Sequence, residues 1–266
     1  WKQKNAHYHR SKKGGGEWEF LSLPEEWQIG YTLSSGAVLS FHLKPFSFKH
    51  TGLFPEQAVN WEEMIRLILD ARKNGKKDIR VLNLFAYTGG ATIACASAGA
   101  RVTHVDASKG MVSWAKENAV LSGLKDAPIR WLVDDCAKFV AREIRRGNHY
   151  DAILLDPPSY GRGPKGEIWK IEESLHPFLR SVSQLLSDEP LFVFLNSYTT
   201  GLAPGVLTYL LSSVLRERGF SAEPGKVPSH NRGRRFVVGS DEIGLPVEGS
   251  GLILPCGACG RAVFVP

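Results

Sequence analysis

Apolar residues from position 79 onward fall into short runs that alternate with longer amphipathic segments. Short apolar runs are typical of buried strands, and apolar residues spaced three to four apart are typical of helices. Strands are therefore expected at residues 79–85, 101–106, 129–135, 150–156 and 190–197. Helices are expected at residues 61–75, 89–99, 108–124, 136–148, 172–187 and 205–220. This alternation predicts an α/β fold with a Rossmann-like, doubly wound, mainly parallel sheet.

The two ends of the chain depart from this alternation. Residues 27–33 and 37–43 are apolar-rich runs around the turn signal Ser34–Gly36, so they predict a β-hairpin. Two late apolar runs, at 234–240 and 261–266, have no helix pattern between them. They predict a hairpin that adds a terminal antiparallel strand to the sheet.

Two helix boundaries and one domain boundary follow from the pattern. Asn60 can cap the helix that begins next to it, because its side chain can accept a hydrogen bond from a free backbone N–H. The helix predicted near residue 175 is expected to be entered around His176 and Pro177, since proline suits a first helical turn. The change of pattern near residue 60 divides the chain into a small region, 1–60, with the hairpin and a loop, and a main domain, 61–266.

The composition is that of a globular protein with a basic excess. Of the 266 residues, 43% are hydrophobic and 23% charged, and the formal net charge is +6. No apolar run approaches the ~18 residues needed to cross a bilayer, so no membrane partner is expected. Basic residues cluster at 1–13, 142–149 and 229–235. Such clusters fit either a solvated surface or contacts to the phosphates of a nucleic acid.

The four cysteines do not form a metal-site pattern. They are Cys95, Cys136, Cys256 and Cys259, and the last two form a single Cys-x-x-Cys. A zinc ribbon needs a second such pair. We therefore expect reduced thiols, a cytoplasmic protein and no bound metal.

Polar and glycine residues follow every predicted strand, at the edge where doubly wound sheets bind ligands. The first strand runs into the turn FAYTGG, residues 85–90. Its glycines let the backbone approach a ligand closely, and the helix that it opens offers free N–H groups to a carboxylate. The turn does not match the G-x-G-x-x-G fingerprint, which argues against a dehydrogenase.

Acidic residues end the second and third strands. An acid at the position of Asp106 can accept hydrogen bonds from both hydroxyls of a ribose, although helix capping is an alternative for which Ser108 competes. Asp135 can accept from an adenine amino group, with the N–H of Cys136 beside it, and Asp134 is a weaker candidate for the same contact. A carboxylate site, a ribose site and an adenine site together match the parts of S-adenosylmethionine.

Three segments carry a resemblance to a known family. They are VLNLFAYTGGATIACASAGARVTHVDASKGMVSWAKENAVLSGL (81–124), TGLFPEQ (51–57) and LLDPPSY (154–160). Together they resemble the class I S-adenosylmethionine-dependent methyltransferases, in the branch of the large-subunit ribosomal RNA enzymes. That branch holds the I-type C5-cytosine methyltransferases and the K half of the K/L enzymes. The resemblance covers about residues 45 to 200.

The resemblance implies that TGLFPEQ is the loop that covers the cofactor. It leaves Phe54 and Gln57 as contacts, because Ala58 replaces the arginine that the branch usually has next. The cofactor-binding residues predicted in this way are Phe54, Gln57, Phe85, Tyr87, Thr88, Gly89, Asp106, Ala107, Asp135, Cys136 and Asp156.

The nature of the acceptor depends on the residues after the fourth and fifth strands. Methylation at cytosine C5 needs a cysteine nucleophile, and the resemblance implies that this cysteine lies after the fifth strand. Here that stretch reads Asn196–Ser197–Tyr198 without a cysteine, so C5 methylation is disfavoured. A ring or exocyclic nitrogen is favoured instead, because an amine can donate to Asp156 and to a carbonyl held by the two prolines next to it.

These arguments predict two further sets of residues. The predicted catalytic residues are Asp156, Pro157, Pro158 and Tyr160, with Tyr160 able to stack on an extruded base. The predicted substrate-binding residues are Asn196, at a base edge, and Arg162 and Lys165, at phosphates. The expected function is methyl transfer from S-adenosylmethionine to a nitrogen in ribosomal RNA. A small molecule or a protein is the alternative acceptor, and the sequence does not predict an oligomeric state.

Overall fold

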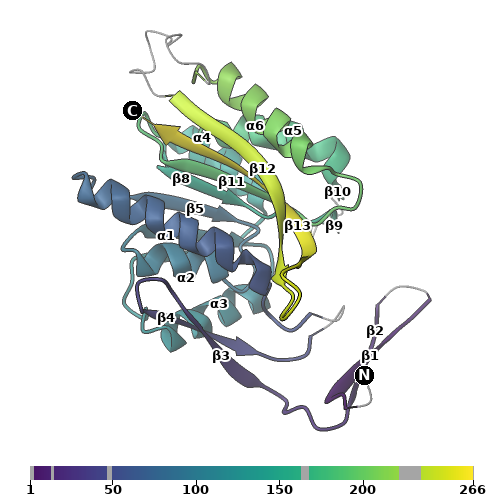
Figure 1. Cartoon of the computed structure of the whole chain (residues 1–266). Coiled ribbons are helices and arrows are strands. Elements are labelled where there is room, and N and C mark those ends of the chain that lie inside the picture. Colours follow the sequence, from purple (N-terminus) through teal and green to yellow (C-terminus); the bar gives the residue numbers. More distant parts are fainter. Residues whose placement is uncertain (1–2, 13–14, 47–49, 163–167, 222–234, 266) are drawn as a thin grey trace.

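A computed structural model describes residues 3–12, 15–46, 50–162, 168–221 and 235–265. One seven-stranded sheet runs through its centre (Figure 1). In spatial order the strands are β12 (Arg235–Pro246), β13 (Ile253–Val265), β11 (Phe192–Ser197), β8 (Ala152–Leu155), β5 (Arg80–Leu84), β6 (Arg101–Asp106) and β7 (Ile129–Val133). The five strands from β11 to β7 are parallel, and β13 is antiparallel to both of its neighbours. The predicted fold class, including the terminal antiparallel strand, is confirmed.

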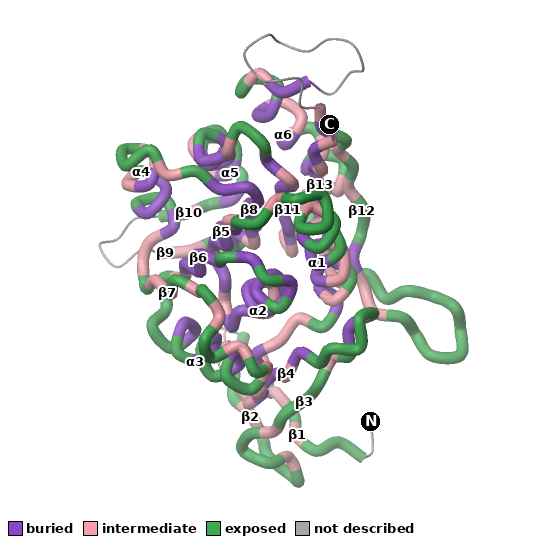
Figure 2. Tube along the Cα trace, turned by 90° about the vertical axis from the view of Figure 1, so that its left-hand side faces the viewer, coloured by how far each residue is buried: buried purple, intermediate pink, exposed green. Residues whose placement is uncertain are grey.

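Helices cover both faces of the sheet because its strands are apolar on both sides. One core contains residues of α1 (Ala58–Lys73), α2 (Gly90–Ser97) and α3 (Lys109–Leu121). The other contains residues of α4 (Cys136–Arg146), α5 (Ile171–Ser183) and α6 (Pro204–Glu217). Along β11, Phe192 and Phe194 enter the first core and Val193 and Leu195 the second. Buried residues accordingly concentrate along the sheet and the inner sides of the helices (Figure 2).

Two small hairpins precede the sheet. The predicted hairpin is confirmed as β3 (Trp27–Thr32) paired with β4 (Val38–Leu43). It packs on α3, where Asn118 Oδ1 accepts from the backbone N–H of His42 at 2.8 Å. A second hairpin, β1 (Ala6–Arg10) with β2 (Gly16–Phe20), was not predicted, because its charged sequence read as a basic tail. The domain boundary at residue 60 stays a prediction.

Two predicted helix starts are wrong. A short 3₁₀ turn, η2 (Pro55–Gln57), leads directly into α1, so Asn60 lies inside the helix, fully buried, and does not cap it. Helix α5 begins at Ile171, and Pro177 lies inside it. Proline lacks only one backbone N–H, and the packing of α5 on the second core outweighs that loss. A two-stranded ribbon, β9 (Tyr160–Arg162) with β10 (Ile168–Lys170), also went unpredicted.

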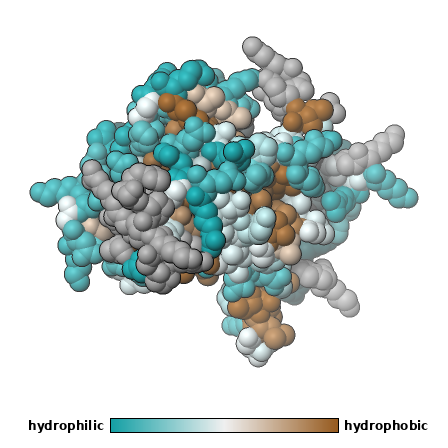
Figure 3. Space-filling model, turned by 90° about the horizontal axis from the view of Figure 1, so that it is seen from above, coloured by the Kyte–Doolittle hydropathy of each residue, from teal (hydrophilic) through white to brown (hydrophobic). Residues whose placement is uncertain are grey.

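The described surface is largely hydrophilic when seen from above (Figure 3). Exposed apolar side chains do gather where β12 turns into β13, at Val247, Leu252, Ile253 and Leu254. In the described ranges, none of the helices has the length and apolar character needed to span a membrane.

Candidate functional site

A cleft of about 420 Å³ opens at the carboxyl ends of the parallel strands. It lies beside the point where the strand order reverses, between β5 and β8, which is where this fold binds ligands. Its lining brings together most of the residues predicted from the sequence. These are Phe54, Phe85, Tyr87, Asp106, Ala107, Asp135, Cys136, Asp156, Pro157 and Pro158.

A small inner cavity of about 50 Å³ adjoins the cleft. The two spaces share Phe54, Phe85, Tyr87 and Asp156 in their linings. Three more predicted residues line only the inner cavity: Gln57, Thr88 and Asn196. Asn196 therefore does not face the outer cleft, where it was expected to meet a base edge.

The turn after β5 holds its backbone in a strained conformation. Phe85 and Tyr87 have φ angles of 56° and 50°, in the left-handed region that residues other than glycine rarely occupy. The neighbouring acid of β6 helps to hold this shape, because Asp106 Oδ2 accepts from the Tyr87 N–H at 2.9 Å. Such strain persists where the surroundings fix it, and it is frequent at binding sites.

Gly89 serves this turn through its backbone. Its φ of 85° suits glycine, and an added Cβ would lie 2.9 Å from the Cβ of Ala115 on α3. It lines neither the cleft nor the inner cavity. Gly89 therefore lets α2 and α3 approach closely, and its predicted contact with the cofactor stays a prediction.

Asp106 and Asp135 keep their predicted places but also bind backbone groups. Asp106 Oδ1 accepts from the Ser108 N–H at 2.8 Å, and burial raises the pKa of this carboxyl. Ser108 caps α3, as expected. Asp135 caps α4 by accepting from the Lys138 N–H at 2.8 Å. Each carboxylate has further lone pairs, so these contacts are compatible with a bound ligand.

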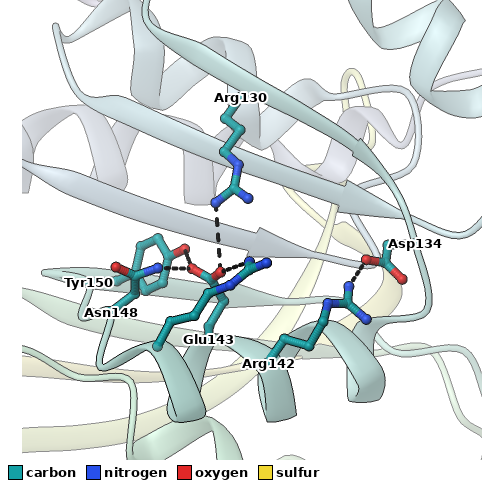
Figure 4. Close-up of polar contacts among 7 residues, drawn as sticks. Arg130, Asp134, Arg142, Glu143, Asn148 and Tyr150 are labelled. Atoms are coloured by element: carbon teal, nitrogen blue, oxygen red, sulfur yellow. Dashed lines mark hydrogen bonds and ion pairs between the residues drawn. The ribbon is translucent and has the colours of Figure 1, made fainter.

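Asp134, the weaker adenine candidate, does not line the cleft. It forms an ion pair with Arg142 on the outer side of α4 (Figure 4). The structure thus separates the two adjacent acids, with Asp135 in the cleft and Asp134 in a surface pair.

The loop before α1 closes one wall of the cleft. Thr88 Oγ1 donates to the Gly52 carbonyl at 2.6 Å, which ties this loop to the turn after β5. The ring of Phe54 then lies 5.5 Å from Tyr87 and 5.3 Å from Tyr198. His50 also lines the cleft, and its ring contacts that of Phe54.

Asp156 is the most perturbed acid of the cleft. Burial and the nearby Glu56 carboxylate raise its pKa to about 7. Glu56 itself is only 6% exposed. Two carboxylates in one low-dielectric region disfavour each other's charge, so a cation bound between them is stabilised.

The segment after Asp156 is fastened at each of its next three residues. Trp169 Nε1 donates to the Pro158 carbonyl at 2.7 Å. The hydroxyl of Ser159 lies 2.7 Å from that of Thr199, and its carbonyl accepts from the Ile171 N–H. Pro157 is buried against the cleft. The wall beside Asp156 is therefore rigid.

Some predicted residues lie elsewhere. Tyr160 is 51% exposed on β9 and does not line the cleft, whereas Trp169 from β10 does. The backbone of Arg162 belongs to β9, and Lys165 lies outside the described residues. Sequence reasoning missed Trp169 and Tyr198 as lining residues. The signal for Trp169 was an isolated aromatic in a polar stretch soon after the prolines.

The cysteines offer no activated nucleophile. Cys95, Cys136 and Cys259 are buried, and burial raises the pKa of each thiol. Cys256 lines a neighbouring pocket with Tyr198, but burial and Glu56 raise its pKa as well. A nucleophilic cysteine needs a lowered pKa. Within the described residues, no three His, Cys, Asp or Glu side chains meet as metal ligands.

Known proteins share both the sequence pattern and the fold. The chain is 35% identical to the SAM-dependent methyltransferase of Agrobacterium tumefaciens, whose structure matches 99% of this chain and 78% of that chain with a TM-score of 0.82. A methyltransferase solved with S-adenosylhomocysteine (SAH) matches 93% of this chain and 58% of that chain at 21% identity, with a TM-score of 0.65, and supports the fold.

Curated relatives match a part of their own length. The ribosomal RNA large subunit methyltransferase K/L of Shewanella frigidimarina is 33% identical over 161 residues, which are 59% of this chain and 21% of that protein. The K/L enzyme of Shewanella baltica is 32% identical over 184 residues, 68% of this chain and 24% of that protein. The chain thus spans about a fifth to a quarter of the length of these curated relatives.

The family model for S-adenosylmethionine-dependent methyltransferases matches residues 19–201, which include the loop before α1, the strained turn, the aspartates of the cleft and the Asp156–Pro158 segment. The chain therefore belongs to the S-adenosylmethionine-dependent methyltransferase family, and S-adenosylmethionine is its methyl donor.

Proposed function

We propose that this enzyme methylates a ring or exocyclic nitrogen of a base in ribosomal RNA. The observation that carries the proposal is the Asp156–Pro158 wall of the cleft, which hydrogen bonds hold in place, in a cleft whose one lining cysteine among the described residues, Cys136, is buried with a raised pKa. Such a wall can position a nitrogen acceptor. It lacks the activated cysteine that a carbon acceptor such as cytosine C5 requires.

We assign different parts of the methyl donor, S-adenosylmethionine, to the cleft and to the inner cavity. We assign the ribose hydroxyls to Asp106 and the adenine to Asp135 and the N–H of Cys136, all of which line the cleft. The inner cavity suits the amino acid end. Asn83 donates its Nδ2 to Thr92, so its Oδ1 can accept from an ammonium group. The aspartates around the cleft also attract the positive charge of the sulfonium.

Asp156 and one proline carbonyl would orient the acceptor. Trp169 already occupies the carbonyl of Pro158, so we assign the carbonyl of Pro157 to this role. An exocyclic amine that donates to Asp156 and to this carbonyl keeps its lone pair toward the methyl group. Transfer to such an amine also releases a proton, and a carboxylate with a pKa near 7 is suited to accept it. A ring nitrogen needs only the positioning.

The relatives and the charge of the chain support RNA as the acceptor. The curated relatives named above are ribosomal RNA enzymes, and the net charge of +6 favours a polyanion. Tyr160 follows the catalytic segment and is exposed, so it is available to stack on an extruded base. Arg162 and Lys165 follow it in the sequence and are proposed phosphate contacts. Ribosomal RNA as substrate would place the enzyme in the cytoplasm.

The test is mass spectrometry of ribosomal RNA from cells that lack the protein, paired with transfer of labelled methyl by purified enzyme to that RNA. We expect one methylated base to be missing and to be restored in vitro, and its fragmentation identifies the nitrogen. A missing methyl on cytosine C5 would overturn the assignment of the atom. Complete methylation in the deleted strain would overturn the RNA acceptor and favour a small molecule or a protein.

A further inference from the structure

Arg261 reaches the site from near the end of the chain. It lies on β13, and both its Nε and its Nη2 donate to Asn60 Oδ1, at 3.0 and 2.7 Å. Arginine carries only donors, so the oxygen of the Asn60 amide must face it. This contact fixes the orientation of an amide that is fully buried on α1.

The orientation of Asn60 decides that of two further amides. Its Nδ2 donates to Gln57 Oε1 at 2.8 Å and to Asn196 Oδ1 at 3.2 Å. Gln57 must then turn its own NH₂ outward, and its Nε2 donates to the Tyr198 hydroxyl at 2.8 Å. Asn196 likewise keeps its oxygen toward Asn60, which leaves its NH₂ group for the inner cavity that the residue lines.

Because these amides are buried, their orientations can change only together. Gln57 and Asn196 are each about 7% exposed, and a buried amide facing the wrong way would set oxygen against oxygen. One guanidinium therefore sets the direction of three amides. One result is an N–H donor at the inner cavity, which suits a ligand carboxylate. The other is that the Tyr198 hydroxyl, which accepts from Gln57, donates its own proton to a carboxylate such as Glu56.

We propose that Arg261 is a positioning residue of the methyl-transfer site, acting through Asn60 on the donors that Gln57 and Asn196 present. It lines neither the cleft nor the inner cavity, so it acts without touching the cofactor. The proposal rests on the assignment of the inner cavity to the amino acid end of S-adenosylmethionine.

Asn60→Asp is the sharpest test, because it keeps the size of the side chain and its contact with Arg261. It replaces the NH₂ group by a carboxylate oxygen whose negative charge Arg261 pairs, so Gln57 and Asn196 must reverse their amides to donate to the new carboxylate. The inner cavity then presents an oxygen where it presented a donor. We expect S-adenosylmethionine to bind about tenfold more weakly by calorimetry, the effect of one lost hydrogen bond to a charged group.

Arg261→Met and Arg261→Lys complete the series. Methionine removes the donors and should weaken binding to a similar degree, whereas lysine can still donate to Asn60 Oδ1 and should restore most of it. Arg180→Met is the matched control, since it removes a surface guanidinium that pairs with Glu217 between α5 and α6. It should leave the affinity unchanged.

The outcomes separate the proposal from other roles of the same residue. Arg261 also lies over the ring of Phe194, so a purely structural role would lower the melting temperature in Arg261→Met without weakening binding. Wild-type affinity in both Asn60→Asp and Arg261→Met would overturn the proposal. Because cofactor binding needs no acceptor, this result is independent of whether the enzyme methylates ribosomal RNA.

Discussion

The two ends of β8 differ in how their buried carboxylates are neutralised. At one end hydrogen bonds and arginines surround the carboxylate, and at the other end two carboxylates lie near each other. Before the strand, Glu143 of α4 is fully buried and accepts from Tyr150 Oη at 2.7 Å, from Asn148 Nδ2 at 2.9 Å and from Arg146 Nη1 at 3.1 Å (Figure 4). Arg130 approaches the same carboxylate from β7. After the strand, Asp156 and Glu56 lie near each other, and in the described part of the chain neither forms an ion pair with Lys or Arg.

The pKa values follow this difference. Burial alone would raise the pKa of Glu143, but hydrogen bonds from Tyr150, Arg146 and Asn148 outweigh it and lower the pKa. At Asp156, burial and Glu56 act in the same direction and raise the pKa to about 7. A carboxylate that the protein satisfies supports the fold. A carboxylate that the protein leaves without such partners is available to a ligand, and for Asp156 we propose the positive sulfonium of the methyl donor.

The largest effect is expected at the unsatisfied end. Asp156→Ala removes the group that we assign to the acceptor, so kcat should fall by about 10²- to 10⁴-fold, the usual contribution of a positioned acid or base. Binding of S-adenosylmethionine, measured by calorimetry, should change only a few-fold, because Asp106 and Asp135 remain. Full turnover by this variant would exclude Asp156 from the acceptor side.

Asp156→Asn refines the result. The asparagine oxygen can still accept a hydrogen bond from an amine but cannot take its proton. Substantial activity in this variant would mean that Asp156 acts by orientation. Loss of activity to the level of Asp156→Ala would mean that it accepts the proton.

The satisfied end should affect stability instead. Glu143→Leu leaves the buried Tyr150 hydroxyl without its acceptor and removes the partner of two half-exposed arginines, which should lower the free energy of unfolding by about 1–3 kcal/mol. Urea unfolding measures this change. Asp78→Ala is the control, because Asp78 pairs with Arg101 on the surface and should cost less than about 1 kcal/mol. If Glu143→Leu unfolds with the wild-type midpoint, the contrast between the two ends fails.

The Asp156 end of this contrast could be predicted from the sequence, since strand ends are visible as polar residues after apolar runs. Asp106, Asp135 and Asp156 were found in this way, because parallel strands bring their carboxyl ends to one edge. Contacts between distant segments could not be predicted. The partner of Gln57 lies 141 residues away at Tyr198, and that of Asn60 lies 201 residues away at Arg261.

Local signals also failed where packing overrode them. Asn60 has the side chain of a helix cap, but it is buried inside α1 because Arg261 and Asn196 satisfy it there. The Glu143 cluster read as a basic surface knot, since the sequence does not show that one acid points inward among the arginines. In both cases a polar side chain was assigned to water or to the backbone and instead met another side chain.

The smallest effect concerns how the pKa of Asp156 responds to the cofactor's charge. S-adenosylmethionine carries a sulfonium and S-adenosylhomocysteine does not, but both carry the same amino acid group. The ratio of their affinities therefore measures how strongly the carboxylates of the cleft attract the sulfonium. Because burial and Glu56 raise the pKa of Asp156 to about 7, the negative charge of this carboxyl develops as the pH rises through that region. The ratio in favour of S-adenosylmethionine should therefore rise with pH up to about 7 and then level off.

Replacing Glu56 should shift this titration without removing it. In Glu56→Gln the carboxylate beside Asp156 loses its charge, so the pKa of Asp156 falls and the midpoint of the affinity ratio should move down by about half a pH unit. The shift is modest because burial, the larger cause, remains. Glu63→Gln, which removes an acid that pairs with Arg66 on the outer side of α1, should leave the midpoint in place. A ratio that does not change with pH would show that the sulfonium lies away from Asp156. An unmoved midpoint in Glu56→Gln would leave burial alone as the cause of the raised pKa at this end of β8.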